Sequence, residues 1–308
     1  MRPVCLGADL QLPAGHTLRG QVLACFAHAA HVALEDGRLM TLLCGPTQYG
    51  MRILTVADND WPTLRRALAI GDEVTLSDAT LRHARVAISL DGVTTWRAPQ
   101  IDGLVVRLDT DARNRITRNM QIWLDARIAV DHACVPTPSL ALWRAAQEGF
   151  LDTVDALRDH NYERLDECVR AALGLGPGLT PSADDMMAGL LVALHMTHAP
   201  HAPLTQCVQR HWHGTTHASR DVLAQASRGW TTSRMAEVCH ALTRPDETTA
   251  LEAALAAQAA IGAHSGLDTL IGLCAGIALS ESDHDGIRIL QSHFRRQHTP
   301  AFERSLSP

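Results

Sequence analysis

Short runs of alternating hydrophobic and polar residues dominate the first hundred positions. This period of two is typical of half-buried strands, and the turn pairs Asp36-Gly37 and Asp91-Gly92 separate neighbouring runs. A helix is expected among them at Trp61–Ala69, with Pro62 in its first turn. The pattern predicts strands at Thr17–Phe26, His31–Glu35, Leu39–Cys44, Met51–Val56, Glu73–Leu76, Arg85–Leu90 and Val93–Arg97. Short strands of this kind favour a small β-barrel or a sandwich-like domain.

The spacing of hydrophobic residues changes to three and four after the polar stretch near residue 110. Helices are expected at Ile116–Ala133, Pro138–Gln147, Leu151–His160, Tyr162–Leu173, 182–197, 203–212, 218–227, 231–242, 247–260 and 265–280. The predicted fold class is therefore α+β. A β-rich domain of residues 1–110 precedes a larger all-helical domain of residues 111–308.

Composition then narrows the possible chemistry. The net charge is −6 and aromatic residues make up only 4%, which argues against a nucleic-acid partner. All 27 basic residues are arginine, so the chain has no lysine for a Schiff base or a P-loop. Any clamp for a carboxylate or phosphate must use arginine, hydroxyl groups, backbone amides or a metal.

The cysteines and the hydropathy pattern bear on location. The eight cysteines form no CxxC pair, which is typical of a reducing compartment without a disulfide framework. The first residues lack the apolar run of a signal peptide. No stretch reaches the roughly 18 apolar residues that a membrane span needs. We expect a cytoplasmic protein that does not engage a membrane.

The glycine-rich segment Gly174–Asp185 (GLGPGLTPSADD) is the first candidate for chemistry. Gly176 and Gly178 permit positive φ and close backbone approach, and Thr180 adds a hydroxyl group. Ser182 is the expected N-cap, with Asp185 as the acidic member of a capping box. Free amides at such a helix start bind anions. The alternative is a well-made turn with an ordinary cap.

The adjacent acids Asp184 and Asp185 point about 100° apart on a helix, so they cannot serve one proton together. One could cap the helix while the other faces a cavity. A carboxylate there could position a nucleophile, orient an arginine or hold Mg²⁺. The alternative is a solvated helix start, where acids are favoured anyway. No cofactor and no metal-ligand set is assigned, and Mg²⁺ stays an option.

A second candidate is the segment from His264 to Asp268. Residues 182–190 and 265–273 both read S-x-x-D-x-x-x-G-L, either through duplication or because both helices meet the same physical needs. Ser265 and Asp268 would repeat the cap, and Gly266 would let a ligand approach. His264 could be a general acid or an anion donor, or an ordinary polar residue before a helix.

The third candidate is a cluster of hydroxyl groups before another helix. Thr215, Thr216 and Ser219 could bind an oxyanion, and Arg220 in the first helical turn could pair with a carboxylate. The alternative is again a capped helix start. We predict one composite site of three helix N-termini around one small anion. Its catalytic candidates are Asp184, Asp185, His264 and Asp268, and its binding candidates are Gly176, Gly178, Thr180, Ser182, Thr215, Thr216, Ser219, Arg220, Ser265 and Gly266.

Histidine spacing raises one further possibility. His195, His198 and His201 are three residues apart, as some metal ligands are, but the intervening Ala199-Pro200 ends the helix. No HExxH motif is present. Surface histidines are the preferred interpretation, ahead of a zinc site.

These motifs resemble those of a known family. GLGPGLTPSADDMMAGLL resembles the GLGPGLTPSGDD signature of the AllH-like family, formerly a domain of unknown function. The family's TTxxS and HSGxD elements are similar to Thr215–Ser219 and His264–Asp268, in the same order. The departure is Ala183, where the signature has glycine. A methyl group there could narrow the site, so the substrate need not be the family's own.

The resemblance implies a subunit of an oxamate carbamoyltransferase. Such an enzyme would convert oxalurate and phosphate to oxamate and carbamoyl phosphate in anaerobic breakdown of allantoin, a purine product. The implied partners are an acyl-CoA-synthetase-like subunit and a further carbamoyltransferase subunit. The alternatives are a non-catalytic or effector-binding subunit of an acyl- or carbamoyl-transferring complex, and a stand-alone hydrolase of a related ureide.

Overall fold

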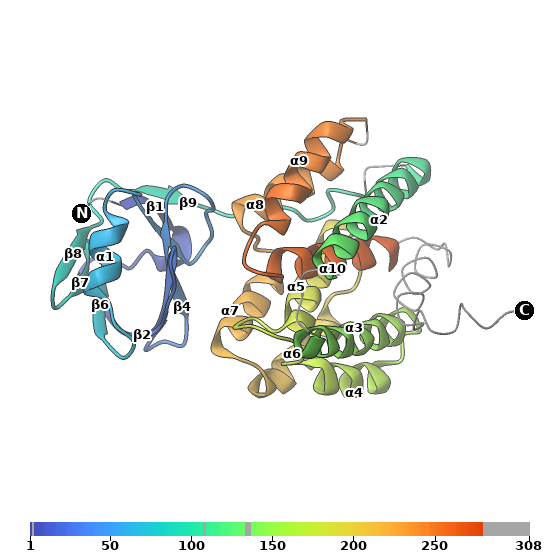
Figure 1. Cartoon of the computed structure of the whole chain (residues 1–308), viewed down its shortest axis with the longest axis horizontal. Coiled ribbons are helices and arrows are strands. Elements are labelled where there is room, and N and C mark those ends of the chain that lie inside the picture. The colour runs from blue at the N-terminus through green and yellow to red at the C-terminus, as the bar shows by residue number, and fades with distance from the viewer. Residues whose placement is uncertain (2, 107–108, 133–136, 245, 280–308) are drawn as a thin grey trace, which may run out of the picture. The chain divides into compact units, whose positions relative to one another are not determined.

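A computed structural model describes residues 1, 3–106, 109–132, 137–244 and 246–279. The chain divides into two compact units (Figure 1). The first contains Met1–Gln100 and the later segment Trp230–Ala236, and the second contains Ile101–Gly229 and the chain from Glu237 onward. One unit is a curled sheet and the other is helical, which confirms the α+β class. The expected domain boundary at residue 110 stays a prediction.

The first unit is a single nine-stranded sheet with strand order β8-β7-β6-β2-β3-β4-β5-β1-β9. The β4–β5 and β1–β9 pairs are parallel, and the other neighbours are antiparallel. The strands are β1 (Pro3–Gly7), β2 (Thr17–Cys25), β3 (Ala29–Leu34), β4 (Leu39–Cys44), β5 (Ile53–Val56), β6 (Glu73–Ser77), β7 (Thr80–His83), β8 (Val86–Ser89) and β9 (Thr94–Trp96).

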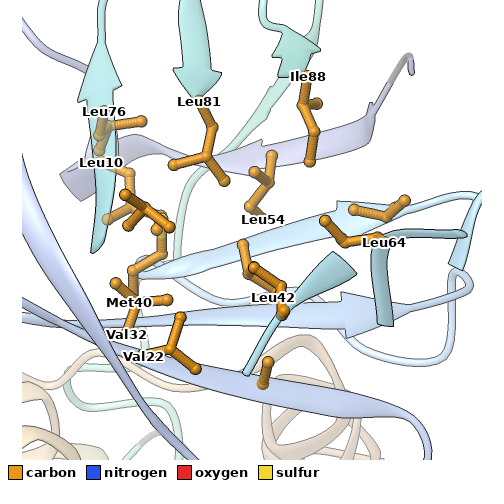
Figure 2. Packing of buried hydrophobic residues seen from close by; sticks show 14 of the residues in the cluster. Leu10, Val22, Val32, Met40, Leu42, Leu54, Leu64, Leu76, Leu81 and Ile88 are labelled. Carbon is orange, nitrogen blue, oxygen red and sulfur yellow. The ribbon is translucent and has the colours of Figure 1, made fainter. Parts of the chain in front are cut away.

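The sheet curls until its β8 edge approaches the start of the chain. The Met1 carbonyl accepts a hydrogen bond from the Ser89 amide at 3.2 Å. The concave face holds the core, to which β3 contributes every second residue (Figure 2). Helix α1 (Trp61–Ala67) adds Trp61 and Leu64 to the same core. This curled sheet is the barrel-like arrangement that short alternating strands favour.

The alternating sequence pattern does not reveal two of the strands, β1 and β7. β1 and β7 have five and four residues, and neither shows a full alternation of buried and exposed positions. In β7 only Leu81 is buried. Runs this short carry almost no periodic signal, and pairing with neighbouring strands decides them.

A substitution at Leu54 tests whether these residues form the core of the β unit. Its side chain is 0% exposed within the β-unit cluster. We expect Leu54→Ala to lower the free energy of unfolding by about 2–5 kcal/mol, because it removes buried methyl groups and leaves a cavity. Leu23→Ala, at a side chain that is 39% exposed, is the control and should cost much less. Urea unfolding measures both, and equal losses would contradict the assigned core.

The second unit contains most of the helices. They are α2 (Thr110–His132), α3 (Thr137–Arg158), α4 (Tyr162–Ala172), α5 (Ser182–Met196), α6 (Ala202–His211), α7 (His217–Ala226), α9 (Thr248–Ala259) and α10 (Ser265–Leu279), and α8 (Ser233–Leu242) begins in the Trp230–Ala236 segment. The predicted ends at Ala133 and residue 280 lie outside the described residues.

One helix prediction is wrong. The expected helices Pro138–Gln147 and Leu151–His160 are a single helix, α3, which continues through Gly149. A Cβ atom at Gly149 would lie 3.0 Å from the Ala172 Cβ of α4. Glycine costs roughly 1 kcal/mol inside a helix relative to alanine. Here it lets two helices pack closely, and that contact outweighs its low helix propensity.

Helices α5 and α10 form the centre of the helical unit (Figure 1). Every residue of α5 is buried, as expected for a helix surrounded by others. A Cβ at Gly189 would lie 1.9 Å from the Thr269 carbonyl oxygen, and one at Gly272 would lie 1.8 Å from the Met186 carbonyl oxygen. The repeated glycine of the two matching segments is therefore where the helix backbones touch.

The same contacts fix the direction of the pair. Gly276 approaches Ala193 further along both helices, so residue numbers rise together and the two helices are parallel. Both N-termini consequently lie at the same end. The positive ends of their dipoles add there, which favours negative charge or bound anions nearby.

The remaining sequence predictions concern cysteines and membranes. The seven cysteines in the described residues are free, and Cys134 lies outside them. None of the described helices is long and apolar enough to cross a bilayer.

Candidate functional site

The glycine loop reaches α5 through two residues that only glycine fits. Gly174 and Gly176 have φ values of +83° and +117°. A Cβ at Gly174 would lie 2.4 Å from the Gly214 carbonyl oxygen, and one at Gly176 would lie 2.5 Å from the Ser182 amide nitrogen. Backbone conformation and close packing therefore both demand glycine. Gly178 is exposed and also has a positive φ, +105°, but a Cβ there would make only an ordinary contact, 3.5 Å from the Thr180 carbonyl oxygen.

The capping prediction for α5 is wrong. Pro181 occupies the N-cap position, and Ser182 is the first helical residue, with a buried Oγ that has no hydrogen-bond partner. The Ala183 amide donates to the Leu175 carbonyl at 3.0 Å. The Asp184 and Asp185 amides donate to the Pro181 carbonyl at 3.0 and 3.2 Å. The folded loop thus satisfies donors that the sequence suggested would be free for an anion.

Asp184 ties the loop to α7. Its Oδ1 accepts from the Gly174 amide at 2.8 Å, and its Oδ2 accepts from the Thr215 hydroxyl. Burial raises the pKa of Asp184, and the bonds from Thr215 and Gly174, with Ser219 nearby, oppose that shift. Both oxygens are engaged within the protein, so Asp184 organises the site and is poorly placed to touch a substrate.

Asp185 faces α10 instead, as the angle between adjacent helical residues requires. Its side chain is buried beside the hydroxyls of Thr180 and Ser265, which hydrogen-bond to each other at 2.7 Å. Burial and the neighbouring Asp268 raise the pKa of Asp185 well above its ordinary value, against the opposing effect of the two hydroxyls. Its Oδ2 makes no hydrogen bond.

Asp268 has a partner that the sequence did not reveal. The indole Nε1 of Trp143, on α3, donates to Asp268 Oδ1 at 2.8 Å, and both side chains are buried. A tryptophan on the apolar face of a helix is ordinarily a core residue. No local pattern links it to an aspartate 125 positions away.

The third segment meets the glycine loop through Thr216. This residue is the N-cap of α7 and accepts from the Ser219 amide at 3.1 Å, while its own hydroxyl donates to the Leu179 carbonyl at 2.7 Å. Ser219 is buried, and its Oγ has no partner with standard hydrogen-bond geometry. Arg220 is half-buried, and its Nε donates to the Thr216 carbonyl at 3.4 Å.

Groups at the start of α10 are likewise engaged in contacts within the protein. The Gly266 amide donates to the Ile261 carbonyl at 3.0 Å, and a Cβ at Gly266 would lie 2.0 Å from the Gln258 carbonyl oxygen. Gly266 therefore packs against α9 and does not offer its amide to a ligand. His264 is half-buried directly before the helix, and its carbonyl accepts from the Asp268 amide at 2.9 Å.

Taken together, the contacts join all three predicted segments. Thr180 binds Ser265, Thr215 binds Asp184, and Thr216 binds Leu179, although the segments are far apart in the chain. The buried oxygens without a partner in this region are Ser182 Oγ, Asp185 Oδ2 and Ser219 Oγ. The arrangement is a cluster of hydroxyl and carboxyl groups at the positive end of two parallel helices.

Family models match most of the chain. The model described as oxamate carbamoyltransferase subunit AllH matches residues 172–277, which include all three segments. The model of the AllH family N-terminal domain matches residues 6–95, within the curled sheet. This chain belongs to the AllH family. No solved structure matches it.

The position where this AllH-family chain departs from the signature is internal. Ala183 is fully buried, and its amide is bonded to the Leu175 carbonyl at 3.0 Å. Its methyl group therefore packs in the protein interior.

The histidines of this AllH-family chain are only partly as expected. His195 is buried, which corrects its interpretation as a surface residue. Its Nδ1 lies 2.8 Å from Asp102 Oδ1 and its Nε2 lies 3.2 Å from the Ser227 carbonyl. The ring also stacks on His201 at 4.1 Å between centroids. Among the described residues, no group of three or more potential ligands is arranged to hold a metal ion.

The raised pKa of Asp185 predicts a dependence of stability on pH. The folded protein holds this proton more tightly than the unfolded chain, so the contribution is fully present below the unfolded pKa of about 4 and is lost as pH rises through the folded pKa. We expect Asp185→Asn to gain stability relative to wild type as pH rises from 4. Asp152→Asn, at an exposed side chain, is the control. Urea unfolding across pH measures both, and parallel curves for Asp185→Asn and wild type would contradict the assignment.

Proposed function

We propose that this chain is the substrate-binding subunit of an oxamate carbamoyltransferase-like enzyme. It would act in transfer of a carbamoyl group between oxalurate and phosphate, giving oxamate and carbamoyl phosphate. Membership of the AllH family supports a carbamoyltransferase-related subunit. Hydrogen bonds join the three segments that the AllH model covers, which supports a role for them in binding the anionic substrates.

The reaction requires positioning more than reactive groups. An oxygen of hydrogen phosphate attacks the ureido carbonyl carbon of oxalurate and forms the new C–O bond. The C–N bond to the oxamate nitrogen breaks, and that nitrogen gains the proton that hydrogen phosphate loses. A site for this step must hold two anions and stabilise the charge that develops on the carbonyl oxygen.

In this proposal the side chains supply those contacts. The amides of Ala183, Asp184, Asp185 and Gly266 are already bonded within the protein. The hydroxyl groups of Thr180 and Ser265 lie beside Asp185, and the buried Ser182 hydroxyl at the start of α5 has no partner. Arg220 would pair with the oxalurate carboxylate, and His264 would relay the proton that hydrogen phosphate loses to the departing nitrogen. Both residues stand directly at helix starts that border the cluster.

One observation carries the proposal. The buried Asp185 Oδ2 has no hydrogen-bond partner, although the adjacent Asp184 carboxylate and the Thr180 and Ser265 hydroxyls are paired. Leaving a buried polar atom unpaired costs roughly 1–3 kcal/mol, so such atoms usually serve a ligand or store strain. This atom lies between two segments that the AllH model covers.

Reconstitution tests the proposal. The chain would be purified with an acyl-CoA-synthetase-like subunit and a further carbamoyltransferase subunit, and phosphate-dependent consumption of oxalurate would be followed with formation of carbamoyl phosphate. We expect His264→Ala and Asp185→Ala to lower kcat/KM at least 100-fold, the order seen for loss of a proton donor or an oxyanion contact. Arg244→Ala, at an exposed arginine, is the control.

The same experiment separates the alternatives. The internal pairing of Thr180 with Ser265, and of Asp184 with the Gly174 amide and the Thr215 hydroxyl, favours an effector-binding subunit as the second candidate. In that case the variants would alter activation by a bound anion and leave the unstimulated rate unchanged. Wild-type rates in both variants under all conditions would contradict a role of this site in catalysis and in regulation.

A further inference from the structure

We propose that Asp185 binds its ligand as a neutral carboxylic acid that donates a hydrogen bond from Oδ2 to an oxyanion, a carboxylate or a phosphate. The inference rests on the proposed function, because it concerns the same site. It assigns this carboxyl group a role opposite to that of a base or a metal ligand. The ligand class follows from the donor, since a neutral acid offers an O–H to an electron-rich oxygen.

The backbone amides that would ordinarily bind an anion at these helix starts already donate hydrogen bonds within the protein. Amides at the start of α5 bond to Leu175 and Pro181, and the Gly266 amide at the start of α10 bonds to Ile261. The parallel helices still place two positive dipole ends together, so the electrostatic attraction for an anion remains. An anion drawn there needs hydrogen-bond donors from side chains.

The groups around Asp185 disfavour its charged form. The charged groups that act on it are Asp268 on α10 and Asp184 on its own helix, and the polar groups are the Ser265 and Thr180 hydroxyls. Two acidic neighbours and burial all disfavour a further negative charge. The raised pKa of Asp185 agrees with this geometry. An ionised Asp185 would repel an anionic ligand, whereas the neutral acid would hold it.

Asp185 differs from the other two acids in its hydrogen bonds. Asp184 accepts hydrogen bonds on both oxygens, from the Gly174 amide and the Thr215 hydroxyl. Asp268 accepts from the Trp143 indole, a donor that stabilises a carboxylate. Asp185 Oδ2, in contrast, is buried and has no hydrogen-bond partner. A proton on that oxygen gives the site one unsatisfied donor, which a ligand oxygen would satisfy.

The protonation state can be measured directly on the full chain. Spectra of protein labelled with ¹³C at the aspartate carboxyl carbon, for wild type and Asp185→Asn, would assign the Asp185 signal. We expect this signal to keep the chemical shift of a neutral carboxyl well above the pH at which exposed aspartates ionise. In Asp268→Asn it should titrate at lower pH, because the repelling charge is gone. An Asp185 that ionises in the same pH range as the exposed aspartates, or no change in Asp268→Asn, would overturn the proposal.

Binding of oxamate and of inorganic phosphate, measured by calorimetry on the same proteins, tests the donor role. Asparagine keeps a neutral donor of similar shape, so Asp185→Asn should bind within about threefold of wild type, whereas Asp185→Ala should bind about tenfold or more weakly. The arm that responds identifies a carboxylate or a phosphate ligand. Thermal melting of both variants confirms that they are folded.

The outcomes are distinguishable from those of the turnover assay. Equal weakening in Asp185→Asn and Asp185→Ala would overturn the neutral donor, and so would a wild-type chain that binds neither probe. Retained binding in Asp185→Asn without any turnover by the reconstituted complex would support the donor role and contradict only the proposed reaction.

Discussion

Gly272→Ala should lower the free energy of unfolding of the helical unit by about 3 kcal/mol or more, at the upper end of the cost of overpacking. The added Cβ would lie 1.8 Å from the Met186 carbonyl oxygen and 2.9 Å from the Leu190 amide nitrogen. Both atoms belong to the backbone of α5, so no side-chain rotation relieves the clash. The helices must separate, and their N-termini at the candidate site must separate with them.

Gly149→Ala is the matched control. It adds the same methyl group to another contact between helices, at a half-buried position, but its nearest neighbour is the Ala172 Cβ at 3.0 Å. We expect this variant to stay within about 1 kcal/mol of wild type, because the gain in helix propensity offsets mild crowding. Chemical unfolding and oxamate binding measure both variants. Equal stability of Gly272→Ala and Gly149→Ala would contradict the close backbone contact of α5 and α10.

Asp184→Ala should produce the second large effect, a loss of about 3–5 kcal/mol in stability together with loss of anion binding. The substitution removes both acceptors that hold the Gly174 amide and the Thr215 hydroxyl. It leaves these donors with no replacement acceptor, and it frees the glycine loop from α7. The cost exceeds that of one hydrogen bond because a single carboxyl group joins two segments.

A series at this position separates the acceptor role from charge. Asp184→Asn keeps one carbonyl oxygen, so it should retain more stability than Asp184→Ala. Thr215→Val removes one of the two bonds and should cost less than Asp184→Ala. Its effect should largely disappear in the Asp184→Ala background, as a double-mutant cycle would reveal. Additive losses would show that Asp184 and Thr215 act independently, against the contact described above.

Much of the fold follows from local sequence patterns. The alternation in residues 29–34 and the turn at Asp36-Gly37 identify β3 and β4 because one face of the sheet is buried. The short strands β1 and β7 could not be predicted from local patterns, since pairing with other strands decides them. The expected break between Gln147 and Leu151 is wrong for a similar reason, because contact with α4 outweighs the low helix propensity of Gly149.

The candidate site was also predictable only in part. Repeated S-x-x-D-x-x-x-G-L spacing located two helix starts, and the hydroxyl cluster located a third, which the structure brings together. The sequence could not show that the α5 amides would bond to Leu175 and Pro181. Nor could it place the Trp143 indole on Asp268, because that contact depends on the packing of α3 against the central pair.

The most direct test of the account is a crystal structure of the chain grown with oxamate. We predict an oxamate oxygen within hydrogen-bonding distance of Asp185 Oδ2, with the hydroxyl of Thr180 or Ser265 as a further contact. Asp184 should keep its bonds to Gly174 and Thr215. Oxamate bound away from α5 and α10, with Asp185 Oδ2 still unpaired, would contradict the assignment of this cluster as the ligand site.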